Sequence, residues 1–208
     1  MSGKLCPKVI LEGTRLTGKT DLAFALNEHP RLVGPRRYRY HSPLVSAEWC
    51  AFTPVPWGRG LIDFEPDEAD HALETYATWV RLFELQRHYS WIVDRFHLST
   101  IAYQRSRGRA YDFGWLEERI RPLGFAVVLC TRSPETFAAA REERLKVSGK
   151  PSQYDDLSVF IREQEVLRAL AAGSSLPVLE LDVTSGDLDA ACGRIADWLD
   201  ASGTLSCA

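Results

Sequence analysis

The sequence predicts an α/β fold, in which helices cover both faces of a mostly parallel sheet. Short apolar runs alternate along the chain with longer segments of helical period, which is typical of repeated β-α units. The chain has 208 residues, of which 45% are hydrophobic and 25% charged, so it is long enough for one domain with a substantial core. We therefore expect a single domain over residues 1–208.

The expected strands are short runs rich in β-branched or aromatic residues, of the length found in buried parallel strands. Four such runs stand out: Lys8–Glu12, Trp91–Asp94, Phe125–Cys130 and Val178–Asp182. Arg37–Tyr40 is a weaker fifth candidate. These runs predict the sheet.

The expected helices have apolar residues at spacings of three and four, as one face of an amphipathic helix does. These faces are Ala69, Leu73, Tyr76, Val80 and Phe83; Leu157, Phe160, Ile161, Gln164, Leu167 and Ala171; and Leu188, Ala191, Cys192, Ile195 and Leu199. Between Pro30 and Pro66 lie six of the eleven prolines and little periodicity. We expect a long irregular connection there, of the kind that often carries function.

Composition disfavours some partners and compartments. A formal net charge of −3 provides no overall positive field of the kind that nonspecific nucleic-acid binders use, so nucleic acid is a disfavoured partner. The first residues lack the apolar run of a signal peptide, and no window approaches the roughly 18 to 20 apolar residues that cross a bilayer. We expect a cytoplasmic protein without a membrane partner.

The five scattered cysteines, with no CxxC pair, are expected to be free thiols.

Residues Gly13–Thr20, GTRLTGKT, match the GxxxxGK[ST] pattern in full. An apolar strand leads into the match and a helical segment, Asp21–Asn27, follows it, as the pattern requires. Glycines let the backbone bend so that successive N–H groups surround a β-phosphate at a helix N-terminus. The segment therefore predicts a phosphate-binding loop and a nucleoside triphosphate ligand.

Within this loop, Lys19 is expected to neutralise β- and γ-phosphate oxygens, and the Thr20 hydroxyl to bind Mg²⁺. The other expected contacts to the triphosphate are Gly13, Thr14, Arg15, Thr17 and Gly18. The alternative, a glycine-rich turn with an exposed lysine, does not require Gly18, Lys19 and Thr20 together.

A second polar group stands at the end of the run Trp91–Asp94, where open α/β sheets place their ligands. Asp94 is suited to hold Mg²⁺ or its water shell. Arg95 can form the bidentate contact that a guanidinium offers to a phosphate or carboxylate. The alternative is a salt bridge at the strand end, with Asp94 as a helix N-cap.

The segment 94–104, DRFHLSTIAYQ, resembles the acceptor-site motif of thymidylate kinases: DR, an aromatic or His, two residues, Ser, then Ala-Tyr-Gln. The order of the other predicted elements is also similar to that of the family, over nearly the whole chain. An apolar strand leads into residues 131–135, an arginine-rich lid follows, and a last strand leads into residues 182–184. The resemblance implies the P-loop NTPase three-layer fold, with a five-stranded parallel sheet flanked by helices and a short lid. It also implies ATP and Mg²⁺ as cofactors, and dimers are usual for the resembled family.

By this resemblance, Arg95 would hold the phosphate of the acceptor, and Asp94 would lie near the metal and the transferring group. The acceptor pocket would be bordered by Phe96, Ser99, Tyr103 and Gln104.

Two positions depart from the family pattern. Thymidylate kinases usually carry an acid at the second variable position of the phosphate loop, where it contacts the sugar hydroxyl of the acceptor. Here this position is Arg15, which would instead hold an anionic group or touch the transferring phosphoryl, unless it is only a solvated loop arginine. Trp79 aligns with the arginine that reads thymine, and we expect it to line the pocket. Thymidine monophosphate is therefore not the expected acceptor.

Arg141 and Arg144 lie near the end of a predicted helix, followed by the polar stretch VSGKP. We expect a lid over about residues 141–153 that closes over the triphosphate and places one of these arginines against the charge of the transferring group. The alternative is a charged solvent face, with Glu142 and Glu143 as ion-pair partners.

The sequence thus predicts an ATP- and Mg²⁺-dependent kinase that acts on a nucleotide or nucleoside-like acceptor. Its expected catalytic residues are Lys19, Asp94, Arg95, Arg141 and Arg144. One alternative is a P-loop kinase for a non-nucleotide metabolite, for instance in secondary metabolism. A nucleic-acid-modifying kinase is less favoured, although Arg36–His41 interleaves cations with aromatic rings. A GTP-driven switch is disfavoured, because Thr131–Pro134 lacks an Asn/Thr-Lys-x-Asp element for guanine.

Overall fold

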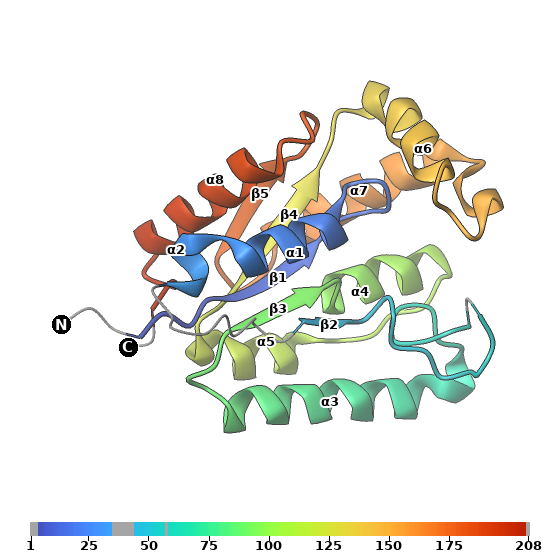
Figure 1. The fold of residues 1–208 in the computed structure, drawn as a ribbon. Helices are drawn as coiled ribbons and strands as arrows, with labels where there is room; N and C mark the ends of the chain where they lie inside the picture. Colours follow the sequence, from blue (N-terminus) through green and yellow to red (C-terminus); the bar gives the residue numbers. More distant parts are fainter. Residues whose placement is uncertain (1–3, 35–43, 57, 207–208) are drawn as a thin grey trace.

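The computed structural model describes residues 4–34, 44–56 and 58–206 and shows three layers, with helices on both sides of a central sheet (Figure 1). All strand pairs of this sheet are parallel, and the strand order is β2-β3-β1-β4-β5. The strands are β1 (Lys8–Glu12), β2 (Leu44–Ser46), β3 (Trp91–Asp94), β4 (Phe125–Thr131) and β5 (Val178–Asp182). The predicted fold class is confirmed.

The edge strand β2 differs from the sequence-based expectation. It spans only Leu44–Ser46, pairs with β3, and is half-buried. The candidate Arg37–Tyr40 lies outside the described residues. Three residues are too few for a periodicity signal, so β2 has no clear signature in the sequence.

Eight α-helices lie within the described residues. They are α1 (Lys19–Glu28), α2 (Pro30–Val33), α3 (Ala69–Leu85), α4 (His97–Ser106), α5 (Gly114–Ile120), α6 (Phe137–Leu145), α7 (Leu157–Ala172) and α8 (Leu188–Ala201). Helices α3, α7 and α8 follow the predicted apolar faces. In the part of the chain that the structure describes, no helix is both long and apolar enough to cross a membrane.

The core lies on both faces of the sheet, because successive side chains of a strand point to opposite sides. Val9 and Leu11 of β1 pack with α1 and α8, whereas Ile10 packs with residues of α3, α4, α5 and α7. Figure 1 shows α1 and α8 on one side of the sheet and α3 to α5 on the other. Both faces of β1, β3 and β4 are therefore buried.

The strand order brings the two predicted functional segments together. β1 and β3 are hydrogen-bonded neighbours, with Leu11 opposite Asp94. The phosphate loop follows β1 directly, and Arg95 follows β3. Since parallel strands end at the same edge of a sheet, both segments leave the sheet side by side, where open α/β folds bind their ligands.

Among the described cysteines, one departs from the expectation of free thiols; Cys207 lies outside the described residues. Cys6, just before β1, is disulfide-bonded. The expectation is therefore wrong for Cys6, whereas Cys50, Cys130 and Cys192 are free thiols.

Gly13→Ala should destabilise the protein by at least about 2 kcal/mol. Gly13 has φ 146°, and a Cβ at this position would lie 2.5 Å from the backbone oxygen of Cys130 in β4. Gly193→Ala in α8 is the matched control, because a Cβ at Gly193 would have no other atom within 4 Å. This substitution should stabilise the protein by about 0.5 to 1 kcal/mol. Urea unfolding followed by circular dichroism measures both changes. A Gly13→Ala variant as stable as the parent would contradict the close approach of the loop to β4.

Candidate active site

The phosphate loop turns sharply between β1 and α1. Gly18 takes φ 65°, and Leu16 takes φ 69°, although non-glycine residues rarely adopt this left-handed conformation. The Leu16 side chain packs against a small apolar cluster of Phe137, Tyr154 and Phe160. This contact gives Leu16 an apolar environment and helps to hold the turn.

Lys19 lies inside the loop, with only 6% of its surface exposed. Its ammonium donates hydrogen bonds to the Thr14 carbonyl oxygen at 2.7 Å and to the Thr17 hydroxyl at 3.2 Å. Burial lowers the pKa of Lys19, and the positive charge of Arg95 lowers it further. A bound anion would raise this pKa again, so the position of the Lys19 ammonium is compatible with a bound anion.

Thr20 and Asp94 form the other predicted pair. The Thr20 hydroxyl donates to Asp94 Oδ2 at 2.8 Å, and the buried Oδ1 has no hydrogen-bond partner among the described residues. Burial raises the pKa of Asp94. An unpartnered buried carboxylate oxygen beside a hydroxyl fits Mg²⁺ or one of its waters. Among the described residues no three His, Cys, Asp or Glu side chains gather as a metal site, so Mg²⁺ would take most ligands from phosphates and water.

Arg95 is held in a strained and buried position. Its backbone takes φ 58°, and its side chain is 4% exposed. Nε donates to the Ser99 hydroxyl at 3.0 Å, one terminal nitrogen donates to Glu163 at 2.7 Å, and the other lies 3.6 Å from Glu48. Burial alone would lower the pKa of Arg95, but Glu163 and Glu48 outweigh burial and raise it.

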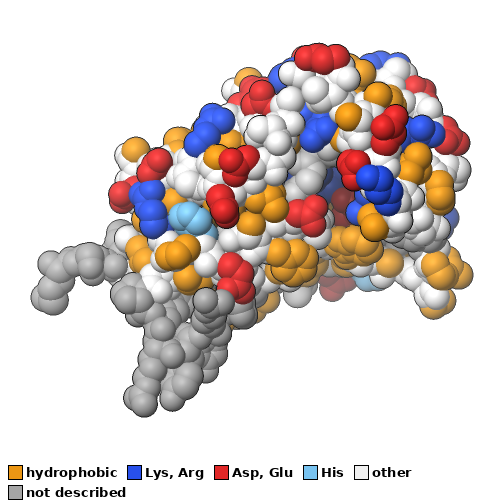
Figure 2. Space-filling view, turned by 45° about the horizontal axis from the view of Figure 1, so that its top comes forward, with side chains coloured by type: hydrophobic (Ala, Val, Ile, Leu, Met, Phe, Trp, Pro, Cys, Tyr) orange, Lys and Arg blue, Asp and Glu red, His pale blue; other side chains and the backbone are white. Residues whose placement is uncertain are grey.

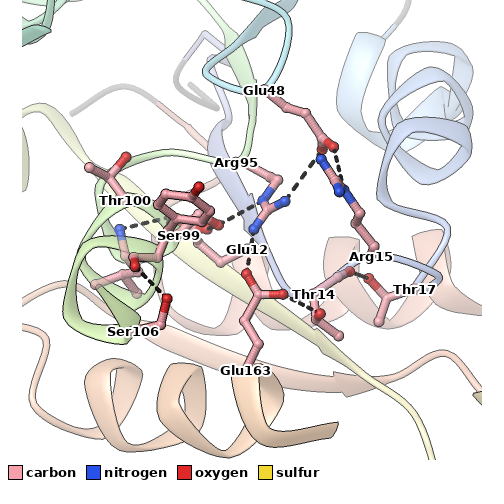
Figure 3. A network of polar contacts seen from close by, with 12 residues as sticks. Glu12, Thr14, Arg15, Thr17, Glu48, Arg95, Ser99, Thr100, Ser106 and Glu163 are labelled. Atoms are coloured by element: carbon pink, nitrogen blue, oxygen red, sulfur yellow. Dashed lines mark hydrogen bonds and ion pairs between the residues drawn. The ribbon is translucent and has the colours of Figure 1, made fainter. Parts of the chain in front are cut away.

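Glu48 follows β2 and faces the cations of both functional segments. It contacts Nε of Arg15 at 3.3 Å and also Arg95 (Figure 3). Burial would raise its pKa, but the charges of Arg95, Lys19 and Arg15 lower it to about 2. Arg15 therefore forms an ion pair with Glu48, although 39% of its side chain is exposed to solvent.

Glu163 of α7 connects the loop to Arg95 from the opposite side. One of its carboxylate oxygens accepts from Arg95, and the other accepts from the Thr14 hydroxyl. Figure 3 shows Glu48 and Glu163 on either side of the Arg95 guanidinium.

Glu12, the last residue of β1, is fully buried and caps α4 from a distance of more than eighty residues along the chain. The cap residue of α4, Phe96, has no side-chain oxygen to accept a hydrogen bond. Glu12 Oε1 instead accepts from the backbone N–H groups of Phe96 and Leu98, both at 3.0 Å, and of Ser99 at 3.4 Å. Its other oxygen accepts from the Ser99 hydroxyl. This carboxylate fixes the start of α4, and with it Arg95, against β1.

The residues predicted for the acceptor pocket divide into two groups. Ser99 lies in the Arg95 network. Phe96 is fully buried and stacks on Trp79, with ring centroids 6.1 Å apart and planes inclined by 4°. Gln104 is also fully buried and donates to the backbone oxygens of Ile62 and Phe64.

Neither Tyr103 nor Trp79 has a described polar contact with the Lys19 and Arg95 network. Tyr103 is half-buried and lies beneath the guanidinium of Arg107. Trp79 is half-buried against the apolar cluster under α3 and α4. The structure therefore brings Ser99 to the cations and places Phe96 and Gln104 in the supporting core.

The lid arginines contact their own segment. Nε of Arg141 donates to the backbone oxygen of Tyr154 at 2.8 Å, and Nε of Arg144 donates to the Tyr154 hydroxyl at 3.0 Å. Asp155, not Glu142 or Glu143, is the described ion-pair partner of Arg141. In the described contacts, neither arginine meets the cluster around Lys19 and Arg95.

Three acidic residues of this site were missed in the sequence. Glu12 had a signal, because a carboxylate in an otherwise apolar buried strand needs partners. Glu48 lies in the proline-rich connection, and Glu163 lies next to the apolar face of α7, where an acid is ordinary. Sequence spacing does not show that they converge.

Glu12→Gln should lower the free energy of unfolding by about 1 to 3 kcal/mol, because an amide loses the charge that several N–H donors share and leaves some of them poorly satisfied. Glu180→Gln is the matched control, since Glu180 forms only an exposed pair with Arg168 and its loss should cost less than about 0.5 kcal/mol. Urea unfolding compares the two variants. Equal stability of Glu12→Gln and the parent would show that the cap contributes nothing.

Several solved structures have a fold similar to that of this chain. The YorR protein of Bacillus subtilis, solved in complex with phosphorylated GDP, is similar with a TM-score of 0.61 and 15% sequence identity, over 94% of this chain and 97% of that chain. Thymidylate kinase from Candida albicans has a TM-score of 0.56 and 18% identity, over 97% and 94% of the two chains.

A third similar structure, APE1195, has a TM-score of 0.51 and 17% identity, over 97% of this chain and 98% of that chain. No protein-family model and no curated protein sequence matches the chain. At these identities the likeness concerns the fold. The predicted fold is confirmed: the chain has the thymidylate kinase-like P-loop kinase fold.

Proposed function

We propose that the protein is an ATP- and Mg²⁺-dependent phosphotransferase that moves the γ-phosphoryl group onto a small nucleotide or nucleoside-like acceptor. The observation that carries this proposal is the position of Lys19, inside a complete phosphate loop and next to Asp94 and Arg95. The similar structures support it, since one is named a thymidylate kinase and another holds phosphorylated GDP.

In the proposed reaction, an acceptor oxygen forms a bond to the γ-phosphorus while the bond to the bridging oxygen of ADP breaks, and ADP keeps that electron pair. The backbone N–H groups of the loop and Lys19 bind the phosphates. Thr20 and Asp94 would hold Mg²⁺, which would neutralise phosphate charge. Arg95 adds positive charge near the transferring group. Such a transfer depends mainly on positioning and electrostatics, which this cluster of cations and amides provides.

A non-nucleotide acceptor remains the second candidate, because Trp79 packs on Phe96 where a base-reading arginine would be expected. A nucleic-acid-modifying kinase has less support. Figure 2 shows basic and acidic side chains interspersed over the face in view. The basic segment Arg36–His41 lies outside the described residues.

Lys19→Ala should lower kcat at least a hundredfold, since one preorganised charge at a transition state contributes about 3 to 4 kcal/mol. Lys4→Ala is the control, because Lys4 is an exposed lysine whose described hydrogen bond goes to the His88 carbonyl. ATP consumption with an acceptor panel measures the loss, and circular dichroism tests folding. Normal turnover by a folded Lys19→Ala variant would contradict the kinase proposal.

Residues 146–151 should exchange amide hydrogens quickly in the free protein and more slowly with ATP, Mg²⁺ and acceptor bound, because a lid must open for exchange and close to exclude water. Hydrogen exchange with mass spectrometry measures this, and the buried strand β4 serves as the unchanging reference. Equal protection in both states would contradict the lid.

A further inference from the structure

A small cavity lies at the amino ends of the central strands, at the edge of the sheet opposite the phosphate loop. Its volume is about 140 Å³, and Lys8, the first residue of β1, lines it. Lys8 pairs with the first residues of both neighbouring strands, Trp91 of β3 and Phe125 of β4. The strands of Figure 1 run from this edge toward the phosphate loop, so the cavity is separate from the candidate active site. A cavity of about 150 Å³ can hold a molecule the size of benzene, so this one has room for a small ligand.

The lining of this cavity is basic. Lys8, Arg87 and His88 line it, together with Cys6 and residues of the turn before β4 and of the segment after α8. None of the described lining residues is Asp or Glu. Lys4 adds a further positive charge close by, because its ammonium donates to the His88 carbonyl oxygen at 2.9 Å. Positive charge therefore gathers around a space that has no acidic side chain in its described lining.

Lys8 is the most unusual of these cations, because it is buried without a carboxylate partner among the described residues. It is 3% exposed. Its ammonium donates to the Cys6 carbonyl oxygen at 3.4 Å, near the outer limit of a hydrogen bond, and lies 3.7 Å from the Cys6 sulfur. Because Cys6 is disulfide-bonded, this sulfur carries no negative charge. A buried charge is unfavourable unless it is paired or well hydrogen-bonded, and these two contacts compensate Lys8 only weakly.

The neighbouring charges make the position of Lys8 still less favourable for an ammonium group. Burial, followed by the positive charges of Arg87 and Lys4, lowers the pKa of Lys8 to about 8. An anion in the cavity would compensate these charges and stabilise the protonated form of Lys8. Such an anion can arrive from solvent, since Arg87 and His88 are exposed at the rim.

We propose that this cavity is a binding site for a small tetrahedral oxyanion, a phosphate or sulfate group, which Lys8 and Arg87 hold by charge-assisted hydrogen bonds. A divalent oxyanion suits the site, because more than one cation faces it and a guanidinium can donate two parallel hydrogen bonds to such a group. The site goes beyond the proposed kinase function and does not depend on it.

The first test is a titration of ¹⁵N-labelled protein with sulfate, followed by NMR. The amide signals of Gly124 and Gly203, which line the cavity, report on this site separately from the phosphate loop, where anions also bind. We expect saturable shifts of both signals. Lys8→Met should weaken this binding about tenfold, the effect of one charge-assisted hydrogen bond, whereas Lys19→Ala should leave it unchanged. Absence of shifts at Gly124 and Gly203, or binding that Lys8→Met leaves intact, would overturn the proposal.

A second variant keeps the proposal testable if Lys8→Met does not fold. Arg87 is exposed, so Arg87→Gln leaves the core intact and should weaken sulfate binding about fivefold. Arg81→Gln is the matched control, because Arg81 is an exposed arginine of the preceding helix α3 that pairs with Glu84 and does not line the cavity. Equal sulfate affinity of the Arg87→Gln and Arg81→Gln variants would contradict the site.

The pH dependence distinguishes an anion-binding lysine from a structural one. Below about pH 8 Lys8 is protonated in the free protein, whereas above it the bound anion must draw a proton onto Lys8. Sulfate keeps its charge over this range, so its affinity should fall about tenfold between about pH 7 and pH 9. The other charged groups that face Lys8 are Lys4, Arg87 and His88; Cys6 is disulfide-bonded, and the remaining lining residues have no ionisable side chain.

Lys8→Met should abolish this dependence on pH. A sulfate affinity that is equal at both pH values in the parent protein would overturn the role of Lys8.

Two further titrations distinguish the sources of the oxyanion, namely inorganic phosphate and ribose 5-phosphate, monitored at the same two glycine signals. Tighter binding of inorganic phosphate assigns the site to the free ion, and tighter binding of ribose 5-phosphate assigns it to a phosphorylated metabolite. Either result supports an oxyanion site. If neither of these ligands nor sulfate shifts the two signals, the proposal is wrong.

Discussion

The site depends on one buried carboxylate, that of Glu12 at the end of β1. Burying a charge is unfavourable unless hydrogen bonds compensate it, and Glu12 meets that requirement with N–H groups at the start of α4. The contact joins β1, which leads into the phosphate loop, to the segment that carries Arg95. The left-handed backbone of Arg95 is thus held between β3 and a helix whose start is fixed by β1. A residue keeps such an unfavourable backbone conformation only where the surrounding contacts hold it in place.

Around this contact, the protein pairs both arginines of the site with carboxylates, whereas some buried polar groups have no partner among the described residues. Arg15 and Arg95 form ion pairs with Glu48 and Glu163, whereas Asp94 Oδ1 is buried with no hydrogen-bond partner in the described part of the chain. Unsatisfied groups in a well-packed structure often mark positions that a ligand completes. Two apolar clusters, one on each face of the sheet, provide most of the buried apolar surface. The polar residues at the edge of the sheet are therefore not needed for the apolar core.

The sequence predicted the parts of this protein that rest on local pattern. Apolar runs located β1, β3, β4 and β5, helical period located α3, α7 and α8, and the GxxxxGK[ST] pattern located Lys19 and Thr20. These features depend on residues that are close in the chain. The short edge strand β2 and the charge partners Glu48 and Glu163 depend on contacts between distant segments, and a single sequence does not encode such contacts as a spacing. Phe96 and Gln104 belong to a recognisable motif, yet in the structure both are fully buried, and Gln104 donates a hydrogen bond to a backbone oxygen.

The position of Phe96 also bears on how acceptor specificity is built. Its ring is wedged between Trp79 and Tyr76, so the face of α3 that points toward the site is apolar and aromatic. A hydrophobic wall separates substrates by only about 1 to 3 kcal/mol per methylene, whereas a buried polar partner separates them far more strongly. If this site binds an acceptor, we therefore expect strong discrimination to come from charged residues such as Arg15, Arg95, Glu48 and Glu163, because a charge left unpaired excludes a wrong ligand as effectively as a paired charge attracts the right one.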